Sequence, residues 1–169
     1  MRHVKTAVVA LLLACATVGS AQTPVRPDFS GTWAFDADRS MAPGPNGRIV
    51  IAKMLGDQVT VAQDAITLKL TITIGGEEVR AAYKLDGSAT TNVSSEGGQD
   101  VAIVSRATWE DRKLVITSTS TSDVKGKPVT IETKRVLWID EKGGLILDRS
   151  GTPVSEVTPS RSVYKKVGR

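Results

Sequence analysis

The clearest pattern in the chain is a strict alternation of apolar and polar residues from Ile66 to Ile74. Every second residue in this segment is Ile or Leu, and the residues between them are Thr or Lys. A period of two puts the apolar side chains on one face of a β-strand and the polar side chains on the other. The segment therefore predicts a strand with one buried face.

Similar short segments follow one another along the chain, separated by turn signals such as Gly75-Gly76, Asp86-Gly87 and Lys142-Gly143-Gly144. The first expected strand covers 30–36, and the last covers 162–167. Helical periodicity is absent after the N-terminal segment. We predict an all-β fold, a single antiparallel up-and-down β-barrel of about 8–10 strands, spanning residues 28–167.

Two segments break the simple alternation. In 129–140, Thr133 and Arg135 share a face with apolar residues, whereas Val136 and Trp138 lie opposite. A β-bulge near Lys134 would restore the phase, and without a bulge Arg135 points inward. Residues 117–122 are Ser or Thr throughout, which is typical either of an edge or overhanging hairpin or of a strand that faces a wet lumen.

The N-terminus predicts an export signal. Arg2 and Lys5 precede an apolar run over 6–14, and Gly19-Ser20-Ala21 supplies small residues for cleavage. The run is shorter than the roughly 20 residues of a membrane-spanning helix. We expect a signal peptide over 1–21, an extended Pro-containing linker over 22–27 and a periplasmic or secreted protein without a transmembrane span. Alternatively, Leu12 to Cys15 forms a lipobox, and Cys15 carries a lipid anchor.

Cleavage of the signal peptide would remove two chemically reactive residue types, Cys and His, from the chain. Cys15 and His3 are the single Cys and the single His, so the mature chain would have neither thiol nor imidazole. Disulfides, Ser-His or Cys-His catalysis and His-ligated zinc are then excluded. We expect no cofactor, no metal and no catalytic residue. An enzyme built on carboxylates such as Glu77 and Glu78, or Asp100, is disfavoured, because the adjacent Glu77 and Glu78 point to opposite faces and make a poor acid–base pair.

Charge argues against a nucleic-acid partner. The formal net charge of +4 includes Arg2 and Lys5, and subtracting these two leaves +2 for the mature chain. The remaining basic residues are scattered apart from a short basic tail. A protein that binds nucleic acid through its backbone usually carries a concentrated basic surface.

Three short motifs are similar to those of a known group. They are Asp28-Phe-Ser-Gly-Thr-Trp33 followed by Asp38-Arg-Ser40, Tyr83-Lys-Leu-Asp-Gly-Ser88 with Thr91-Asn92, and Val163-Tyr-Lys-Lys166. Gly-x-Trp resembles the motif that opens the first strand of lipocalins and related calycin barrels. The chain as a whole resembles secreted bacterial lipocalin-like β-barrel proteins of unknown function.

The resemblance implies structural roles for three residues. Gly31 would let the backbone pass close under the barrel floor, and Trp33 would plug the closed end. In lipocalins an Arg near the last strand lies on the indole face, and Arg161 is the matching candidate for a cation–π contact. Fatty-acid-binding proteins instead use an Arg-x-Tyr pair on the final strand. That pair holds a carboxylate. Here Arg161 and Tyr164 are three residues apart and face opposite sides of a regular strand, which argues against the same carboxylate clamp.

The resemblance also implies a function. We expect a non-enzymatic barrel that binds a small hydrophobic or amphiphilic ligand, with Tyr83, Thr133 and Arg135 as candidate lumen residues. The alternative is a structural or interaction module of the cell envelope, with a packed interior and no ligand.

Overall fold

The computed structural model describes residues 25–40, 42–43, 49–50, 53–96, 99–124, 126–153 and 157–168. The predicted signal peptide over 1–21 and the candidate lipid anchor Cys15 lie outside these residues, as do the first three residues of the predicted linker. Both predictions therefore stay predictions.

Ten antiparallel strands form one sheet in the order β6-β5-β4-β1-β12-β11-β10-β9-β8-β7. Strands next to each other in the chain are mostly neighbours in the sheet, and β1 lies between β4 and β12, so the topology is up-and-down. The strands are β1 (Gly31–Phe35), β4 (Gln58–Gln63), β5 (Thr67–Ile74), β6 (Glu77–Lys84), β7 (Thr90–Glu96), β8 (Gln99–Glu110), β9 (Lys113–Val124), β10 (Lys127–Ile139), β11 (Leu145–Thr152) and β12 (Ser160–Val167).

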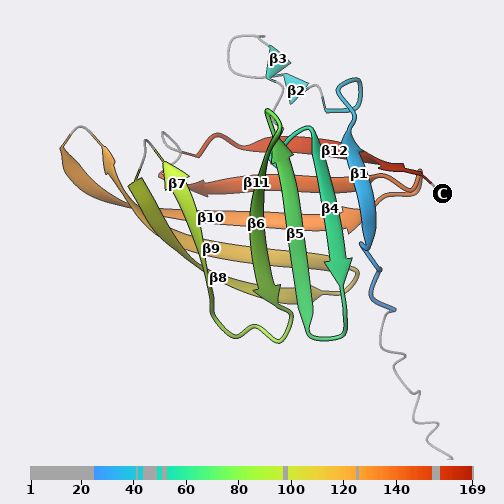
Figure 1. The fold of residues 1–169 in the computed structure, drawn as a ribbon, viewed down its shortest axis with the longest axis horizontal. Helices are drawn as coiled ribbons and strands as arrows, with labels where there is room; N and C mark the ends of the chain where they lie inside the picture. Colours follow the sequence, from blue (N-terminus) through green and yellow to red (C-terminus); the bar gives the residue numbers. More distant parts are fainter. Residues whose placement is uncertain are drawn as a thin grey trace, which may run out of the picture.

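The sheet curls into a nearly closed barrel, which confirms the predicted fold class. Figure 1 shows β4, β5 and β6 crossing steeply over β9 to β12, so that the two halves of the sheet face each other. A separate two-stranded pair, β2 (Ala42–Pro43) and β3 (Ile49–Val50), stands beyond one end. Within the described ranges there is no helix.

The core fills the space between the two halves. Leu68 and Leu70, from the strand that alternation predicted, are 0% and 3% exposed. Ile66 and Ile74 belong to the same alternating segment, but they are 70% and 54% exposed. The prediction of one buried face is therefore wrong at its ends, because Ile66 precedes the first residue of β5 and Ile74 is its last.

Of the two alternatives for the strand around Lys134, the structure shows the one without a bulge. β10 pairs with β9 and with β11 in unbroken register from Glu132 to Leu137. Arg135 therefore lies on the inner face with Leu137, while Trp138 lies on the outer face. There the cations of Lys113 and Arg161 lie 5.1 and 5.3 Å from the centroid of the Trp138 ring.

The polar segment 117–122 lies within β9. Residues 117–119 pair with both β8 and β10, whereas 120–122 pair with β10 alone, so the end of the segment belongs to an overhanging hairpin, as the first interpretation of its composition allowed. Ser118 is buried, and its Oγ lies 2.9 Å from the Oγ of Ser105 on β8. The two hydroxyls satisfy each other inside the barrel, which is how buried polar groups are usually accommodated. Part of this segment therefore faces the interior, as the second interpretation of its composition required.

Trp33 is buried in the core, and its predicted role in closing the barrel stays a prediction. Its ring is 2% exposed, and its Nε1–H donates a hydrogen bond to the carbonyl oxygen of Phe29 at 2.8 Å. Phe29 is itself fully buried and stacks on Trp109, with ring centroids 5.7 Å apart. The backbone of Gly31 has φ of +129°, a conformation that favours glycine over residues with a side chain.

The cation over Trp33 is Lys166, not Arg161, so this predicted contact is wrong. Lys166 Nζ lies 5.2 Å from the Trp33 ring centroid, and the two residues are cross-strand partners in the β1–β12 ladder. Arg161 is an odd number of positions from Lys166 and therefore faces outward. It makes a two-point ion pair with Asp148, at 2.6 and 2.8 Å.

Tyr164 anchors the segment before β4 to the barrel. Its side chain is fully buried, its Oη accepts a hydrogen bond from the Leu55 N–H at 2.7 Å, and it donates to the Gly56 carbonyl at 3.3 Å. Burial raises the pKa of Tyr164 to about 12, from an ordinary value of 10.0. This hydroxyl thus holds two backbone groups that come from more than a hundred residues away in the chain.

We expect Tyr164→Phe to lower the free energy of unfolding by about 1–3 kcal/mol, because a buried N–H loses its acceptor. The wild type should also lose stability as the pH rises from about 10 toward 12, since the unfolded chain ionises Tyr164 at a lower pH than the folded chain does. Urea unfolding of both proteins between pH 7 and pH 11 measures both effects. A variant as stable as wild type at pH 7 would contradict the assigned hydrogen bonds.

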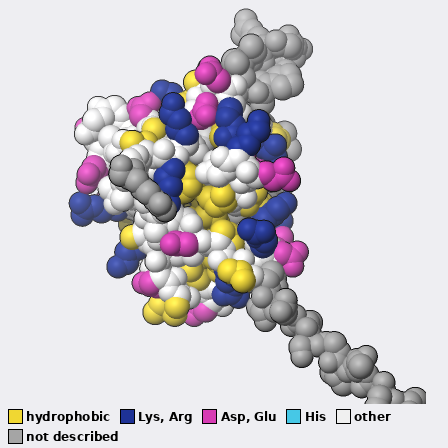
Figure 2. Space-filling model, turned by 90° about the vertical axis from the view of Figure 1, so that its right-hand side faces the viewer, with side chains coloured by type: hydrophobic (Ala, Val, Ile, Leu, Met, Phe, Trp, Pro, Cys, Tyr) yellow, Lys and Arg dark blue, Asp and Glu magenta, His cyan; other side chains and the backbone are white. Residues whose placement is uncertain are grey.

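The outer surface carries mixed charge. On the face shown in Figure 2, Lys and Arg side chains are interspersed with Asp and Glu side chains around small hydrophobic areas. This face has no continuous basic surface.

Candidate functional site

An internal cavity of about 70 Å³ lies between the two halves of the sheet. Apolar side chains from β5, β9, β10 and β11 form most of its wall, and residues 54 and 55 contribute from the segment before β4. Its lining residues are Met54, Leu55, Leu70, Ile72, Tyr83, Ile116, Arg135, Leu137 and Leu147. Two polar groups, the Tyr83 hydroxyl and the Arg135 guanidinium, therefore enter an otherwise apolar space.

Arg135 and Tyr83 meet across this cavity. Arg135 Nη1 lies 3.5 Å from the Tyr83 Oη, although the residues come from opposite halves of the barrel. Tyr83 is 5% exposed and packs within the main core. Of the three lumen residues suggested by the sequence, the structure brings these two together.

A second arginine lies beside Arg135. Arg149 on β11 is the direct cross-strand partner of Arg135, and it shares the inner face with Leu147. Its Nε is buried and makes no hydrogen bond. Burial, followed by the nearby positive charge of Arg135, lowers the pKa of Arg149. Like charges directly opposite each other in an antiparallel ladder are destabilising.

Neither arginine has an acidic partner among the residues that the structure describes. Within the described part of the chain, the ion pairs of arginines are Arg39 with Asp140, Arg80 with Glu78 and Arg161 with Asp148. A partly buried guanidinium without a counter-ion is costly, and proteins usually supply one. We refer to Arg135, Arg149 and Tyr83 as the arginine site.

Thr133 lies apart from the arginine site. It is on the inner face of β10, two residues before Arg135, and it borders a hollow of about 430 Å³ over β9, β10 and β11. Most residues around this hollow point outward from the sheet, including Thr117, Thr119 and Glu132. Thr133 and Arg135 therefore border different spaces.

Sequence reasoning missed Arg149. The signal was present, because Leu145, Leu147 and Arg149 alternate with Ile146 and Asp148. The local pattern predicts a strand over 145–148, whereas β11 continues to Thr152. Because Arg149 lies one residue beyond the predicted strand, it was not recognised as a neighbour of Arg135.

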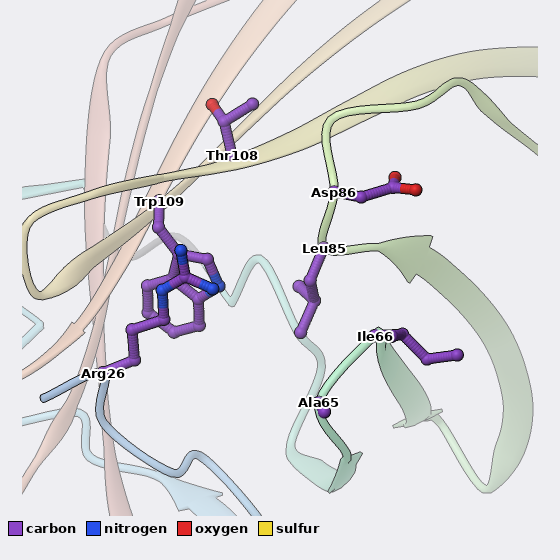
Figure 3. Close-up of a pocket in the computed structure, with 7 residues that line it drawn as sticks. All are labelled: Arg26, Ala65, Ile66, Leu85, Asp86, Thr108 and Trp109. Carbon is purple, nitrogen blue, oxygen red and sulfur yellow. The ribbon is translucent and has the colours of Figure 1, made fainter.

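A second hollow lies around Arg26 and Trp109. Its volume is about 330 Å³, and Arg26, Leu85 and Trp109 are among its lining residues. Figure 3 shows Arg26 lying against the Trp109 ring, while the side chains of Asp86 and Ile66 point away from this pair. The Arg26 guanidinium is 5.5 Å from the ring centroid, so this cation already has a protein partner.

The described residues contain no group of three or more His, Cys, Asp or Glu side chains that could hold a metal ion. A membrane-spanning helix, long and apolar enough to cross a bilayer, is likewise not found among them.

Comparison with solved structures identifies similar folds. The wild-type fluorescent protein UnaG and a point mutant of it each share 19% sequence identity with this chain and superpose with a TM-score of 0.52. The mutant match covers 83% of this chain and 97% of the other. A protein described as the REP1-NXSQ fatty acid transporter matches at 10% identity and the same TM-score, covering 83% of this chain and 96% of its own.

No protein-family model matches the chain, and no curated protein sequence matches it. The structural matches establish the fold alone, a β-barrel that this chain shares with these proteins. At these identities they do not transfer a ligand.

Proposed function

We propose that this protein is a non-enzymatic binding protein that holds a small amphiphilic molecule inside the barrel. The anionic head group of the ligand would lie at the arginine site, and its apolar part along the cavity wall. The observation that carries this proposal is the pair of inward-facing arginines, Arg135 and Arg149, which have no acidic partner among the described residues. The export signal predicted for residues 1–21 supports a location outside the cytoplasm.

An anion would relieve the cost of the arginine site. Two cations on adjacent strands repel each other, and this repulsion is strong where the surroundings exclude water. A carboxylate or phosphate between them would accept charge-assisted hydrogen bonds, and the planar fork of arginine suits such groups. The Tyr83 hydroxyl, 3.5 Å from Arg135, could donate a further bond.

The apolar wall supports an amphiphile rather than a free inorganic anion. Leu70, Ile72, Ile116 and Leu137 line the same cavity as Arg135. Ligand sites of this kind usually combine a mostly apolar wall with a few polar groups. A similar fold in a protein described as a fatty acid transporter supports a long-chain carboxylate as the first ligand to test.

One observation favours the packed-module alternative. The cavity of about 70 Å³ is well below the roughly 300 Å³ of a typical ligand pocket. A long-chain ligand would therefore have to displace side chains or widen the barrel. In the alternative function, the interior stays packed and the protein acts through its surface.

Competition binding separates the two functions. We expect a long-chain fatty acid to displace an environment-sensitive fluorescent probe at least about tenfold more effectively than the alcohol of equal chain length, because only the acid is anionic. Arg135→Gln should remove most of this difference. Arg106→Gln is the matched control, since Arg106 is exposed and donates to the Gly87 carbonyl.

Two outcomes would contradict the proposal. If neither the acid nor the alcohol binds, the packed module becomes the better function. If both bind equally and Arg135→Gln has no effect, the interior takes apolar molecules without using the arginine site.

A further inference from the structure

The barrel closes where β6 and β7, the two edge strands of the sheet, meet. In the part of the chain that the structure describes, no backbone ladder joins them. Instead, Asn92 Oδ1 accepts a hydrogen bond from the Ala82 N–H at 2.8 Å, and Asn92 Nδ2 donates to the Ala82 carbonyl at 3.0 Å. Thr90 Oγ1 also accepts from the Lys84 N–H at 3.2 Å. We call these three contacts the seam.

The Asn92 amide takes the place of a strand residue at the seam. A side-chain amide offers one acceptor and two donors, so it can satisfy both backbone groups of Ala82, as a neighbouring strand would. A regular ladder repeats this exchange along its length, whereas Asn92 provides it once. Separating β6 from β7 should therefore cost much less free energy than separating any of the nine strand pairs joined by backbone hydrogen bonds. Those nine pairs should separate mainly when the whole barrel unfolds.

A hollow of about 280 Å³ lies directly against the seam. Asn92 and Ala82 form one side of it, and the basic residues Lys69 and Arg80 form part of its rim. Leu70 borders this hollow and also lines the internal cavity that contains Arg135. A single layer of the β5–β6 wall thus separates the hollow from the cavity.

We propose that the seam is the entry site of the barrel, where an anionic amphiphile passes between β6 and β7, and that the Asn92 amide holds it shut. Lys69 and Arg80 would attract the head group, because positive charge on a rim raises the encounter rate of an anion. The head group then reaches Arg135 behind Leu70. The identity of the ligand rests on the proposed function, but opening of the seam does not.

Hydrogen exchange tests the opening without any ligand. In Asn92→Ala, we expect the Lys84 amide to exchange about tenfold faster or more, although its own acceptor, Thr90, is unchanged. Thr91→Ala is the matched control, because this exposed neighbour makes none of the seam contacts. Amides in the β4–β5 ladder should keep their wild-type rates. Equal acceleration throughout the barrel, or no change at Lys84, would overturn the proposal.

Stopped-flow binding of a fluorescent long-chain carboxylate tests the entry. A faster gate raises the association and dissociation rates together, so both should rise about tenfold in Asn92→Ala, while Kd stays within about twofold. Unchanged rates in a variant whose Lys84 amide exchanges faster would overturn the entry site and leave the proposed function intact. Absence of binding to the wild type would instead overturn the proposed function, and entry at the seam with it.

Discussion

Replacing Trp33 with alanine is expected to lower the free energy of unfolding by about 3–5 kcal/mol, the usual cost of truncating a buried aromatic side chain. The ring is 2% exposed and packs within the main core. Its loss would leave a cavity there and free the Phe29 carbonyl from its hydrogen bond. Urea unfolding, followed by far-UV circular dichroism to avoid dependence on tryptophan fluorescence, measures the change.

Two further variants separate the contributions of Trp33. Trp33→Phe keeps most of the apolar area but loses the indole N–H, so its cost should be intermediate. Lys166→Met removes the cation 5.2 Å from the ring centroid and should cost under about 1 kcal/mol. A cost below about 1 kcal/mol for Trp33→Ala would contradict the buried position of the indole in the core.

Replacing Arg149 with methionine is expected to change stability and binding in opposite directions. The variant should be more stable by about 1–2 kcal/mol, because it removes a desolvated cation facing a second cation and keeps a similar apolar stem. Its affinity for a long-chain carboxylate should fall about tenfold or more. Residues at ligand sites often lower the stability of the folded protein, so a stabilising substitution that weakens binding would indicate that Arg149 is kept for function.

Arg161→Met is the matched control for this experiment. Arg161 is exposed and pairs with Asp148 on the outer face, so its removal should leave carboxylate affinity unchanged. Thermal unfolding and isothermal titration on both variants give the two quantities. If Arg149→Met destabilises the protein and leaves affinity unchanged, Arg149 is a structural residue and the arginine site is misassigned.

Much of the fold could be predicted from the chain, because strand identity depends on local periodicity and turn chemistry. The alternation over 66–74 lies on β5, and Gly75-Gly76 and Asp86-Gly87 fall at the ends of β6. The sequence predictions failed where the position of a residue depends on contacts with residues far away in the chain. Arg161 was expected over Trp33 from its place near the last strand, yet the register of β1 and β12 puts Lys166 there.

The candidate site was only half predictable. Tyr83 and Arg135 were assigned to the lumen from strand phase alone, but their approach to 3.5 Å depends on how the two halves of the sheet cross. Arg149 was missed because its strand was expected to end one residue earlier. Thr91-Asn92 belonged to one of the motifs that carry the resemblance, but its role was not predictable, since a side chain that replaces a strand looks like any polar residue in a strand.

The sequence by itself determined that this chain forms a β-barrel, because period-two alternation and short turns leave few other ways to bury the apolar face. It also indicated that Trp33 belongs at the start of the first strand and inside the molecule. Only the tertiary structure decided that Lys166 covers Trp33, that two arginines share the interior, and that Asn92 joins β6 to β7. These contacts depend on register and curvature, which arise from pairing between residues far apart in the chain.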